Sequence, residues 1–430
     1  MIKTITYPKV EEWAKLQQRP AVDQGSLFEI AKNIFKDIQQ DGDIAVSKYS
    51  MQFDGVNYSY SPLGLNFIED AESKIPASLK ESIQKAYQNI YKFHASQSEN
   101  AKKIETTQGV TCWRESRAID KVGIYIPGGS APLFSTVLML GIPAKIAGCK
   151  EVVLCTPPNE NGDINPLILY AANLVRIRKV YAVGGIQAIA AMALGTESIP
   201  KVDKIFGPGN QYVTAAKQIA QLHGTAIDMP AGPSEVLVIA DDTSDPEFVA
   251  ADLLSQAEHG PDSQVVLLSN NIKVIDEVNV ALKLQLEQLS RKEIAEKALQ
   301  NSRSILLESI DECINFSNSY APEHLILAIA NAEDKIERVQ SAGSVFLGNY
   351  SCESLGDYAS GTNHTLPTNG FARSYSGVSL DSFVKKITFQ SVSEEGLKNI
   401  GPSVEMMVQA EQLMAHKNAV TIRLNKIDKQ

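Results

Sequence analysis

The spacing of apolar residues divides the chain into a mainly helical start and a longer region in which strands and helices alternate. Apolar residues recur at helical spacing in Ser26–Gln39 and Pro76–Ser96, which predicts two amphipathic helices. Thr106–Ile119 has the pattern of a β-hairpin with Gly109 near its turn. From Lys121 onward, short β-rich runs alternate with helical periodicity, which is typical of βαβ units in a parallel sheet.

Two sets of strands are predicted, separated by the turn Ala231-Gly232-Pro233-Ser234. The first set is Val122–Ile126, Glu151–Cys155, Lys179–Val183 and Lys204–Phe206. The second set is Glu235–Ala240, Gln264–Ser269, Ser304–Leu307, Leu325–Ile329 and Ser344–Leu347. Near the end, Glu394–Ala419 is predicted to be helical and Val420–Leu424 to be a short strand. We therefore expect an α/β fold of two Rossmann-like parallel-sheet units with helical N- and C-terminal segments.

These changes of pattern predict five regions. Residues 1–24 form an N-terminal segment that packs with the C-terminal region, and residues 25–119 form a helical segment and hairpin that join the second α/β unit. The first α/β unit covers residues 120–234, the second covers residues 235–381, and residues 382–430 form a C-terminal helical tail.

Composition and charge narrow the class of protein. The 430 residues are 44% hydrophobic and 21% charged, which indicates a globular chain, and a formal net charge of −10 disfavours nucleic-acid or anionic-membrane partners. No uncharged apolar run reaches the length of a spanning helix, and the first residues do not resemble a signal peptide. Five widely spaced cysteines without a Cys-x-x-Cys pair favour a reduced, cytoplasmic enzyme.

Glycine-rich turns follow four of the predicted strands, where ligands approach the backbone in parallel α/β sheets. They are Pro127-Gly128-Gly129-Ser130, Gly184-Gly185, Gly207-Pro208-Gly209-Asn210 and Ala231-Gly232-Pro233-Ser234. The usual Gly-x-Gly-x-x-Gly fingerprint is absent, because Tyr212 stands where its third glycine would be. The residues alone therefore permit a dinucleotide without requiring one, and ordinary tight turns remain the alternative.

Candidate chemistry gathers around four of the six histidines. Gln256 and His259 point the same way on a helix that Asp245 and Pro246 begin, so they could hold one cation or form a solvated face. Neighbouring Glu323 and His324 suit proton transfer or a surface turn. Asp357 and His364 flank a polar loop and are potential metal ligands, and a solvated loop is the alternative. Glu411 and His416 are spaced so that an ideal helix does not aim them at one atom, and two solvated helix positions are the alternative. A site built from these groups would offer nitrogen and oxygen ligands, which suit zinc or a similar ion.

Several long stretches resemble the histidinol dehydrogenase family. They are Gly123–Gly129, Asp203–Asn210, Met229–Val236, Gln256–Gln264, Ala321–Leu325, Gly356–Pro367 and Ala415–Val420. The resemblance implies two successive NAD-dependent oxidations that convert L-histidinol through the aldehyde to L-histidine, in a homodimer with shared active sites. It also implies that residues 120–234 bind NAD and that the C-terminal tail is exchanged between subunits.

The resemblance further implies roles for individual residues. One zinc ion per subunit would be held by Gln256, His259 and Asp357, together with His416 of the partner subunit. The same four residues would contact the substrate, with Ser234, His324, His364 and Glu411. NAD contacts are carried over to Tyr125, Gln187 and Asn210, and the catalytic pair to Glu323 and His324. As a neutral imidazole, His324 could accept the alcohol proton, and Glu323 could activate the water that hydrates the aldehyde.

Two positions depart from the family pattern. Ile186 stands where alanine is common and Cys352 where proline is common, and neither is a carried-over ligand. The alternatives to the dehydrogenase are a metal-dependent hydrolase of a small amide or ester, with Glu323 as the base, and a binding protein without catalysis.

Overall fold

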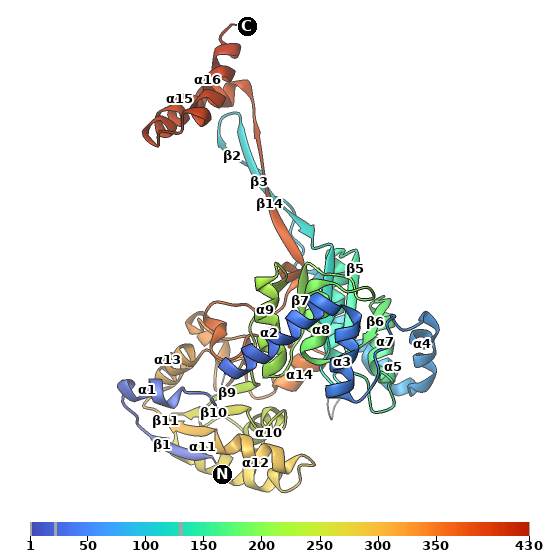
Figure 1. Cartoon of the computed structure of the whole chain (residues 1–430). Helices are drawn as coiled ribbons and strands as arrows, with labels where there is room; N and C mark the ends of the chain where they lie inside the picture. The colour runs from blue at the N-terminus through green and yellow to red at the C-terminus, as the bar shows by residue number, and fades with distance from the viewer. Residues whose placement is uncertain (1, 21–23, 129–131, 430) are drawn as a thin grey trace.

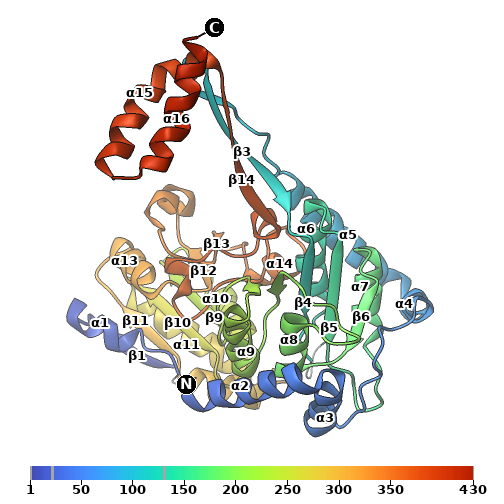
Figure 2. The same ribbon diagram turned by 45° about the horizontal axis from the view of Figure 1, so that its top comes forward.

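The computed structural model describes residues 2–20, 24–128 and 132–429. Two parallel β-sheets form the centre of its body, and a third, antiparallel sheet leads away to a pair of helices (Figure 1 and Figure 2). This arrangement confirms the predicted fold of two parallel-sheet units with helical terminal segments. Gly129 and Ser130 of the first glycine-rich turn, and residues 21–23 of the predicted N-terminal segment, lie outside the described residues.

The first parallel sheet has the strand order β6-β5-β4-β7-β8. Its strands are β4 (Lys121–Tyr125), β5 (Glu151–Thr156), β6 (Lys179–Ala182), β7 (Lys204–Phe206) and β8 (Ala226–Ile227). Helices α6 (Phe134–Ala147), α7 (Pro166–Leu174), α8 (Gly185–Leu194) and α9 (Gln211–Leu222) connect them. The chain runs outward from β4 to β6 and then returns to β7, so the strand order reverses between β4 and β7. A reversal of this kind opens a crevice at the carboxyl ends of the two strands, where ligands bind in open α/β sheets.

The second parallel sheet has the order β1-β11-β10-β9-β12-β13. Its strands are β1 (Lys3–Thr6), β9 (Glu235–Ala240), β10 (Gln264–Ser269), β11 (Arg303–Leu306), β12 (His324–Ala328) and β13 (Ser344–Leu347). Its helices are α10 (Pro246–Ala257), α11 (Ile272–Leu286), α12 (Lys292–Gln300) and α13 (Ile310–Tyr320). Every residue of β9, β10 and β12 is buried, as expected for strands covered on both faces. The sequence analysis did not predict β1, which pairs in parallel with β11.

The N-terminal helices pack on the first unit. They are α1 (Val10–Leu16), α2 (Gln24–Asp41), α3 (Asp43–Asp54), α4 (Leu65–Asp70) and α5 (Ala77–Ala95). Helix α2 contacts α8 and α9, and α5 contacts α6, whereas residues 25–119 were expected to join the second unit. The apolar stripe that predicted α2 explains this placement, because Phe35 and Ile38 are buried in the same core as Ile189 of α8. Helix α1 packs on the second unit, where Trp13 meets Phe316 of α13.

An arm extends from the body at its carboxyl-terminal end (Figure 1). Strands β2 (Ile104–Thr107), β3 (Val110–Ala118) and β14 (Val384–Val392) form its antiparallel sheet, and α15 (Glu394–Ala410) and α16 (Met414–Ile427) form its tip. The prediction of a strand over Val420–Leu424 was wrong, because these residues belong to α16 and pack on α15 near Gly401. No residue of α16 is buried in the single chain. No helix in the described ranges has the length and apolar character needed to cross a membrane.

The remaining short elements connect the units. They are the helix α14 (Glu353–Tyr358) and the 3₁₀ helices η1 (Ala71–Lys74), η2 (Ala332–Arg338), η3 (Phe371–Arg373) and η4 (Leu380–Phe383).

Candidate active site

A cavity of about 360 Å³ lies where opposite ends of the two parallel sheets meet. From the first sheet it receives Tyr125 at the end of β4 and the turn Gly207–Asn210 after β7. From the second sheet it receives Ser234 before β9, together with Glu323 and His324 at the start of β12. The cavity therefore joins the carboxyl edge of one sheet to the amino edge of the other.

Glu323 and His324 are held side by side under the start of β9. Glu323 Oε2 accepts a hydrogen bond of 2.8 Å from the backbone N–H of Glu235. His324 Nδ1 lies 3.2 Å from the carbonyl oxygen of Glu235, and its Nε2 lies 3.3 Å from Oδ1 of Asp357. Both side chains are buried, with 9% and 3% of their surfaces exposed. The strand pairing of β9 with β12 thus fixes an acid and an imidazole within one buried corner of the cavity.

The charges of this corner depend on several carboxyl groups. Burial lowers the pKa of His324. The charge of Glu323, the hydrogen bond with Asp357 and the charge of Glu353 together raise this pKa by more than burial lowers it, so the net shift is upward. Burial raises the pKa of Glu323, and the neighbouring imidazole only partly opposes that shift. The sequence analysis described His324 as a neutral imidazole, whereas its surroundings favour the imidazolium near neutral pH in the single chain. The ordinary pKa of histidine does not apply here, because the sequence does not reveal which carboxylates surround the ring.

Three of the predicted metal ligands line the same cavity: Gln256, His259 and Asp357. Gln256 and His259 come from the C-terminal end of α10, and Asp357 comes from α14. Burial is the main cause that lowers the pKa of His259, which leaves its nitrogen lone pair available. Burial raises the pKa of Asp357, but its hydrogen bond and the surrounding imidazoles lower it more, so the group is a carboxylate.

The amide of Gln256 has one oxygen without a protein partner. Its Nε2 lies 2.8 Å from His324 Nδ1 and donates to the carbonyl oxygen of Glu235 at 3.3 Å. Its Oε1 is buried and accepts no hydrogen bond from any described residue. Among the described residues, no three His, Cys, Asp or Glu side chains are grouped closely enough to hold a metal by themselves. An amide oxygen, a neutral imidazole and a carboxylate nevertheless form a donor set that suits Zn²⁺ if a further ligand is supplied.

The other predicted substrate contacts fall into two groups. Ser234 and His364 line the cavity. His364 is already engaged, because its Nδ1 lies 2.8 Å from the carbonyl oxygen of Asp357 and its Nε2 lies 3.0 Å from Thr136 Oγ1. Burial lowers the pKa of His364, so it bridges α14 and α6 as a neutral ring.

Glu411 and His416 do not reach the cavity of their own chain. Glu411 follows α15 and His416 lies on α16, at the tip of the arm, and both are exposed. The two helices of the arm tip also carry exposed apolar side chains, including Met406 at 75% exposure and Met414 at 57%. Of the predicted catalytic, metal and substrate residues, the single chain therefore brings together all except Glu411 and His416. The predicted cofactor residues are described next.

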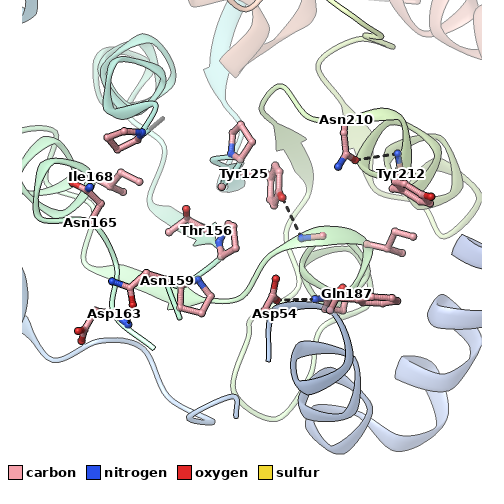
Figure 3. A pocket seen from close by; sticks show the side chains of 18 of the residues that line it. Asp54, Tyr125, Thr156, Asn159, Asp163, Asn165, Ile168, Gln187, Asn210 and Tyr212 are labelled. Atoms are coloured by element: carbon pink, nitrogen blue, oxygen red, sulfur yellow. Dashed lines mark hydrogen bonds between the residues drawn. The ribbon is translucent and has the colours of Figure 1, made fainter. Parts of the chain in front are cut away.

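A second cavity of about 860 Å³ contains the three residues predicted to bind NAD: Tyr125, Gln187 and Asn210 (Figure 3). The N-termini of α7, α8 and α9 open onto it, an arrangement that favours phosphate groups. Asn210 caps α9 through bonds from Tyr212 N (3.1 Å) and Val213 N (3.2 Å), and the hydroxyl of Tyr125 accepts a hydrogen bond of 3.1 Å from Gly185 N.

The two cavities share a wall. Both are lined by Tyr125, Pro127, Gly128 and Asn210. A long ligand in the larger cavity could therefore place one end beside a small ligand in the smaller one. Gly207 permits this junction, because at a φ of 131° any Cβ would lie 2.1 Å from the carbonyl oxygen of Tyr125.

Two carboxyl groups near the cavities, one half-buried and one buried, were not predicted from the sequence. Half-buried Asp54, the last residue of α3, lines the larger cavity, and buried Glu353, the first residue of α14, acts on the charge of His324. Burial raises the pKa of Glu353 to about 8, and the group accepts a hydrogen bond from Ser255. An acid at the C-terminal end of a helix, as at Asp54, opposes the helix dipole and was the one available signal. Cys352, which precedes Glu353, lines neither cavity.

Known proteins match this chain over almost its whole length. A sequence model of the histidinol dehydrogenase family matches residues 17–424. Histidinol dehydrogenase of Bacteroides thetaiotaomicron is 57% identical over 425 residues, which cover 99% of each chain, and that of Bacteroides fragilis is 54% identical over the full length of both. The crystal structure of histidinol dehydrogenase from Elizabethkingia anophelis is 60% identical, covers 99% of each chain and superimposes with a TM-score of 0.97. This chain belongs to the histidinol dehydrogenase family.

Proposed function

We propose that this chain oxidises L-histidinol through L-histidinaldehyde to L-histidine, with two molecules of NAD, in histidine biosynthesis. Family membership supports the overall reaction. The observation that carries the NAD-dependent form is the wall shared by the two cavities. Tyr125 and Asn210 line both cavities, and Glu323 and His324 line the smaller one. Cofactor and substrate would therefore meet beside a buried acid–base pair.

The first oxidation requires a base for the alcohol proton. As hydride leaves the alcohol carbon for NAD, His324 accepts the hydroxyl proton, and the C–O single bond becomes the carbonyl of the aldehyde. His324 must be neutral before this step, so its proton must first leave. Glu323 and Asp357, which bracket the ring, determine how easily that proton leaves.

The second oxidation requires water. Glu323 removes a proton from the water that attacks the aldehyde carbon, and the resulting hydrate loses hydride to the second NAD while His324 accepts its hydroxyl proton. One histidinol, two NAD and one water thus yield histidine carboxylate, two NADH and three protons. The burial that raises the pKa of Glu323 makes it a stronger base than an exposed carboxylate when it is ionised.

One Zn²⁺ per subunit would be held by Gln256, His259 and Asp357, with His416 of the partner subunit as the fourth protein ligand. The buried, unpartnered Oε1 of Gln256 supports this assignment, because a buried amide oxygen without a donor is costly and a cation would stabilise it. Bound there, the ion would anchor the imidazole and amine of the substrate and compete with His324 for the Asp357 carboxylate. The redox chemistry stays with NAD and the proton transfers with Glu323 and His324.

A homodimer with shared active sites accounts for the arm. Glu411 and His416 are exposed, and the helices that carry them present Met406, Met407 and Ile422 to solvent in the single chain. A soluble monomer rarely leaves such a group of large apolar side chains uncovered. A second copy would cover them and would receive the two missing residues in its own cavity.

The proposed reaction is tested by incubating the purified protein with histidinol and NAD, before and after chelation and after zinc is restored. We expect two NADH per histidine formed, loss of activity on chelation and recovery with zinc. Histidinol consumption without NADH would contradict the oxidation and favour a hydrolase. NADH formation that chelation leaves unchanged would remove the metal from the proposal.

The shared site is tested by mixing two inactive variants, His259→Ala and His416→Ala. After random exchange about half of the dimers are mixed, and each mixed dimer contains one site with both histidines intact, so we expect activity to return to as much as about a quarter of the wild-type value. Each variant exchanged with itself is the control. Complete exchange, shown by mass labels, without any recovered activity would contradict the trans arrangement.

A further inference from the structure

The larger cavity carries negative charge and no positive side chain. Among its lining residues, Asp54 and Asp163 are acidic, and none is Lys, Arg or His. A ligand that ends in an extra phosphate would find no counter-charge here, whereas the pyrophosphate of a dinucleotide can use the helix N-termini.

Asp54 is hydrogen-bonded to a fully buried polar residue of this cavity, Gln187. Gln187 is fully buried, and its Nε2 donates to Oδ2 of Asp54 at 3.3 Å (Figure 3). The other amide atom, Oε1 of Gln187, is buried and accepts no hydrogen bond within the described chain. Gln187 therefore holds the Asp54 carboxylate at Oδ2, and this carboxylate supplies two acceptor oxygens to the lining of the larger cavity.

The two acceptor oxygens of the Asp54 carboxylate fit a vicinal diol. The two hydroxyls of a ribose can each donate a hydrogen bond, and a carboxylate is the usual partner of such a pair in dinucleotide-binding sheets. In those sheets the carboxylate usually follows the second strand, but here β5 is followed by Pro157 and Pro158. In this fold a helix outside the sheet, α3, brings a carboxylate to the cavity instead.

The position of Asp54 selects one ribose of the dinucleotide. Asp54 and Gln187 line the larger cavity but not the smaller one, so neither is part of the shared wall where hydride transfer would occur. The nicotinamide end must reach that wall, which leaves the adenosine half for Asp54. This inference rests on the proposed use of a nicotinamide dinucleotide.

We propose that Asp54, oriented by Gln187, binds the ribose hydroxyls of the adenosine half and excludes dinucleotides that carry a 2′-phosphate. A 2′-phosphate would remove one hydroxyl donor and place about two negative charges beside the carboxylate. Asp54 is thus a specificity-determining residue that selects NAD over NADP.

The proposal is tested by direct binding of NAD and NADP to the zinc-loaded protein, with calorimetry as the readout, and by kcat/KM with each dinucleotide. We expect the wild type to bind NAD at least 100-fold more tightly than NADP. Asp54→Ala should weaken NAD binding by ~10–100-fold, the usual value of a hydrogen bond to a charged group. Asp54→Asn keeps the shape and removes the charge, so it should raise the NADP-to-NAD affinity ratio by at least 10-fold.

Asp163→Asn is the matched control, because it removes the same charge from an exposed position on the rim of the cavity, beside Asn159. We expect it to change the ratio less than threefold. Three results would each overturn the role of Asp54. The first is an equal NADP-to-NAD affinity ratio in the wild type and Asp54→Asn, and the second is wild-type binding of NADP as tight as that of NAD. The third is a change of the ratio in Asp163→Asn as large as that in Asp54→Asn. Binding of neither dinucleotide to the wild type would instead refute the proposed cofactor.

Discussion

Breaking the buried ion pair between Lys217 and Asp228 should destabilise the first α/β unit strongly. The two side chains are 4% and 0% exposed, and together they hold both sides of Gly207. Lys217 Nζ donates to the carbonyl oxygen of Gly207 at 2.9 Å, while Asp228 Oδ2 accepts from its N–H at 2.8 Å. Replacing Lys217 by Met preserves its apolar length but leaves the Asp228 carboxylate buried without a counter-charge.

The magnitude follows from that burial. Removing one partner of a buried ion pair costs about 3–5 kcal/mol, whereas an exposed pair is worth about 0–1 kcal/mol. Lys150 and Asp120 provide the exposed comparison in the same unit, with side chains 75% and 53% exposed and a separation of 3.1 Å. We therefore expect Lys217→Met to lower the free energy of unfolding by several kcal/mol more than Lys150→Met.

Guanidinium unfolding followed by circular dichroism measures this difference at a fixed protein concentration. The double variant Lys217→Met, Asp228→Asn should recover part of the loss, since Asn keeps an acceptor for Gly207 and removes the uncompensated charge. NAD affinity should fall in Lys217→Met as well, because the Gly207 turn positions Asn210. If Lys217→Met and Lys150→Met unfold at the same denaturant concentration, the reasoning from burial is refuted.

Three further changes test other parts of the structure. Burial raises the pKa of Asp252 from 3.8 to about 7, so the stability present at low pH is lost as the pH rises toward 7. Thermal unfolding should therefore show that Asp252→Asn stabilises the protein by ~2–3 kcal/mol more at pH 8 than at pH 5. Equal stabilisation at the two pH values would contradict the pKa shift. Gly207→Ala should abolish NAD binding measured by calorimetry, because its Cβ would collide with the Tyr125 backbone; unchanged affinity would refute that clash. Ser255→Ala should cost ~1–3 kcal/mol in denaturant unfolding, since Glu353 loses its donor, and Ser319→Ala, at an exposed position, is the control.

The sequence predicts the helices and strands of this fold better than it predicts which elements pack against one another. Asp245 and Pro246 mark the start of α10, and the structure confirms the cap through a 2.9 Å bond from Glu247 N to Asp245 Oδ1. Continuous apolar runs such as Glu235–Ala240 identify buried strands because both faces of the sheet are covered. Local patterns of this kind survive without knowledge of distant contacts.

Features that depend on distant partners could not be predicted in the same way. Strand β1 has only four residues, none buried, and it exists through its pairing with β11. The β-branched residues Val420, Thr421 and Ile422 suggested a strand, but packing of α16 on α15 overrides that preference. Asp54 was not predicted as a site residue, because its partner, Gln187, lies 133 positions away along the chain.

The candidate site shows the same division. Adjacent residues such as Glu323 and His324 could be recognised as a pair from their order in the chain. The protonation of His324 could not, since Asp357 and Glu353 approach it from another element. Resemblance to the family supplied the set that spacing alone left open, including the assignment of His416 to a neighbouring subunit.

The pairing of β1 with β11 has a consequence for synthesis of the protein. Residues 3–6 leave the ribosome 300 positions before their partners at 303–306. At ~5–20 residues per second, this strand waits ~15–60 s without the edge against which it pairs. The outer edge of β11 is likewise uncovered until residues 3–6 pair with it. The second unit therefore completes its sheet only late in translation. Until then it exposes a strand edge that other nascent chains could join.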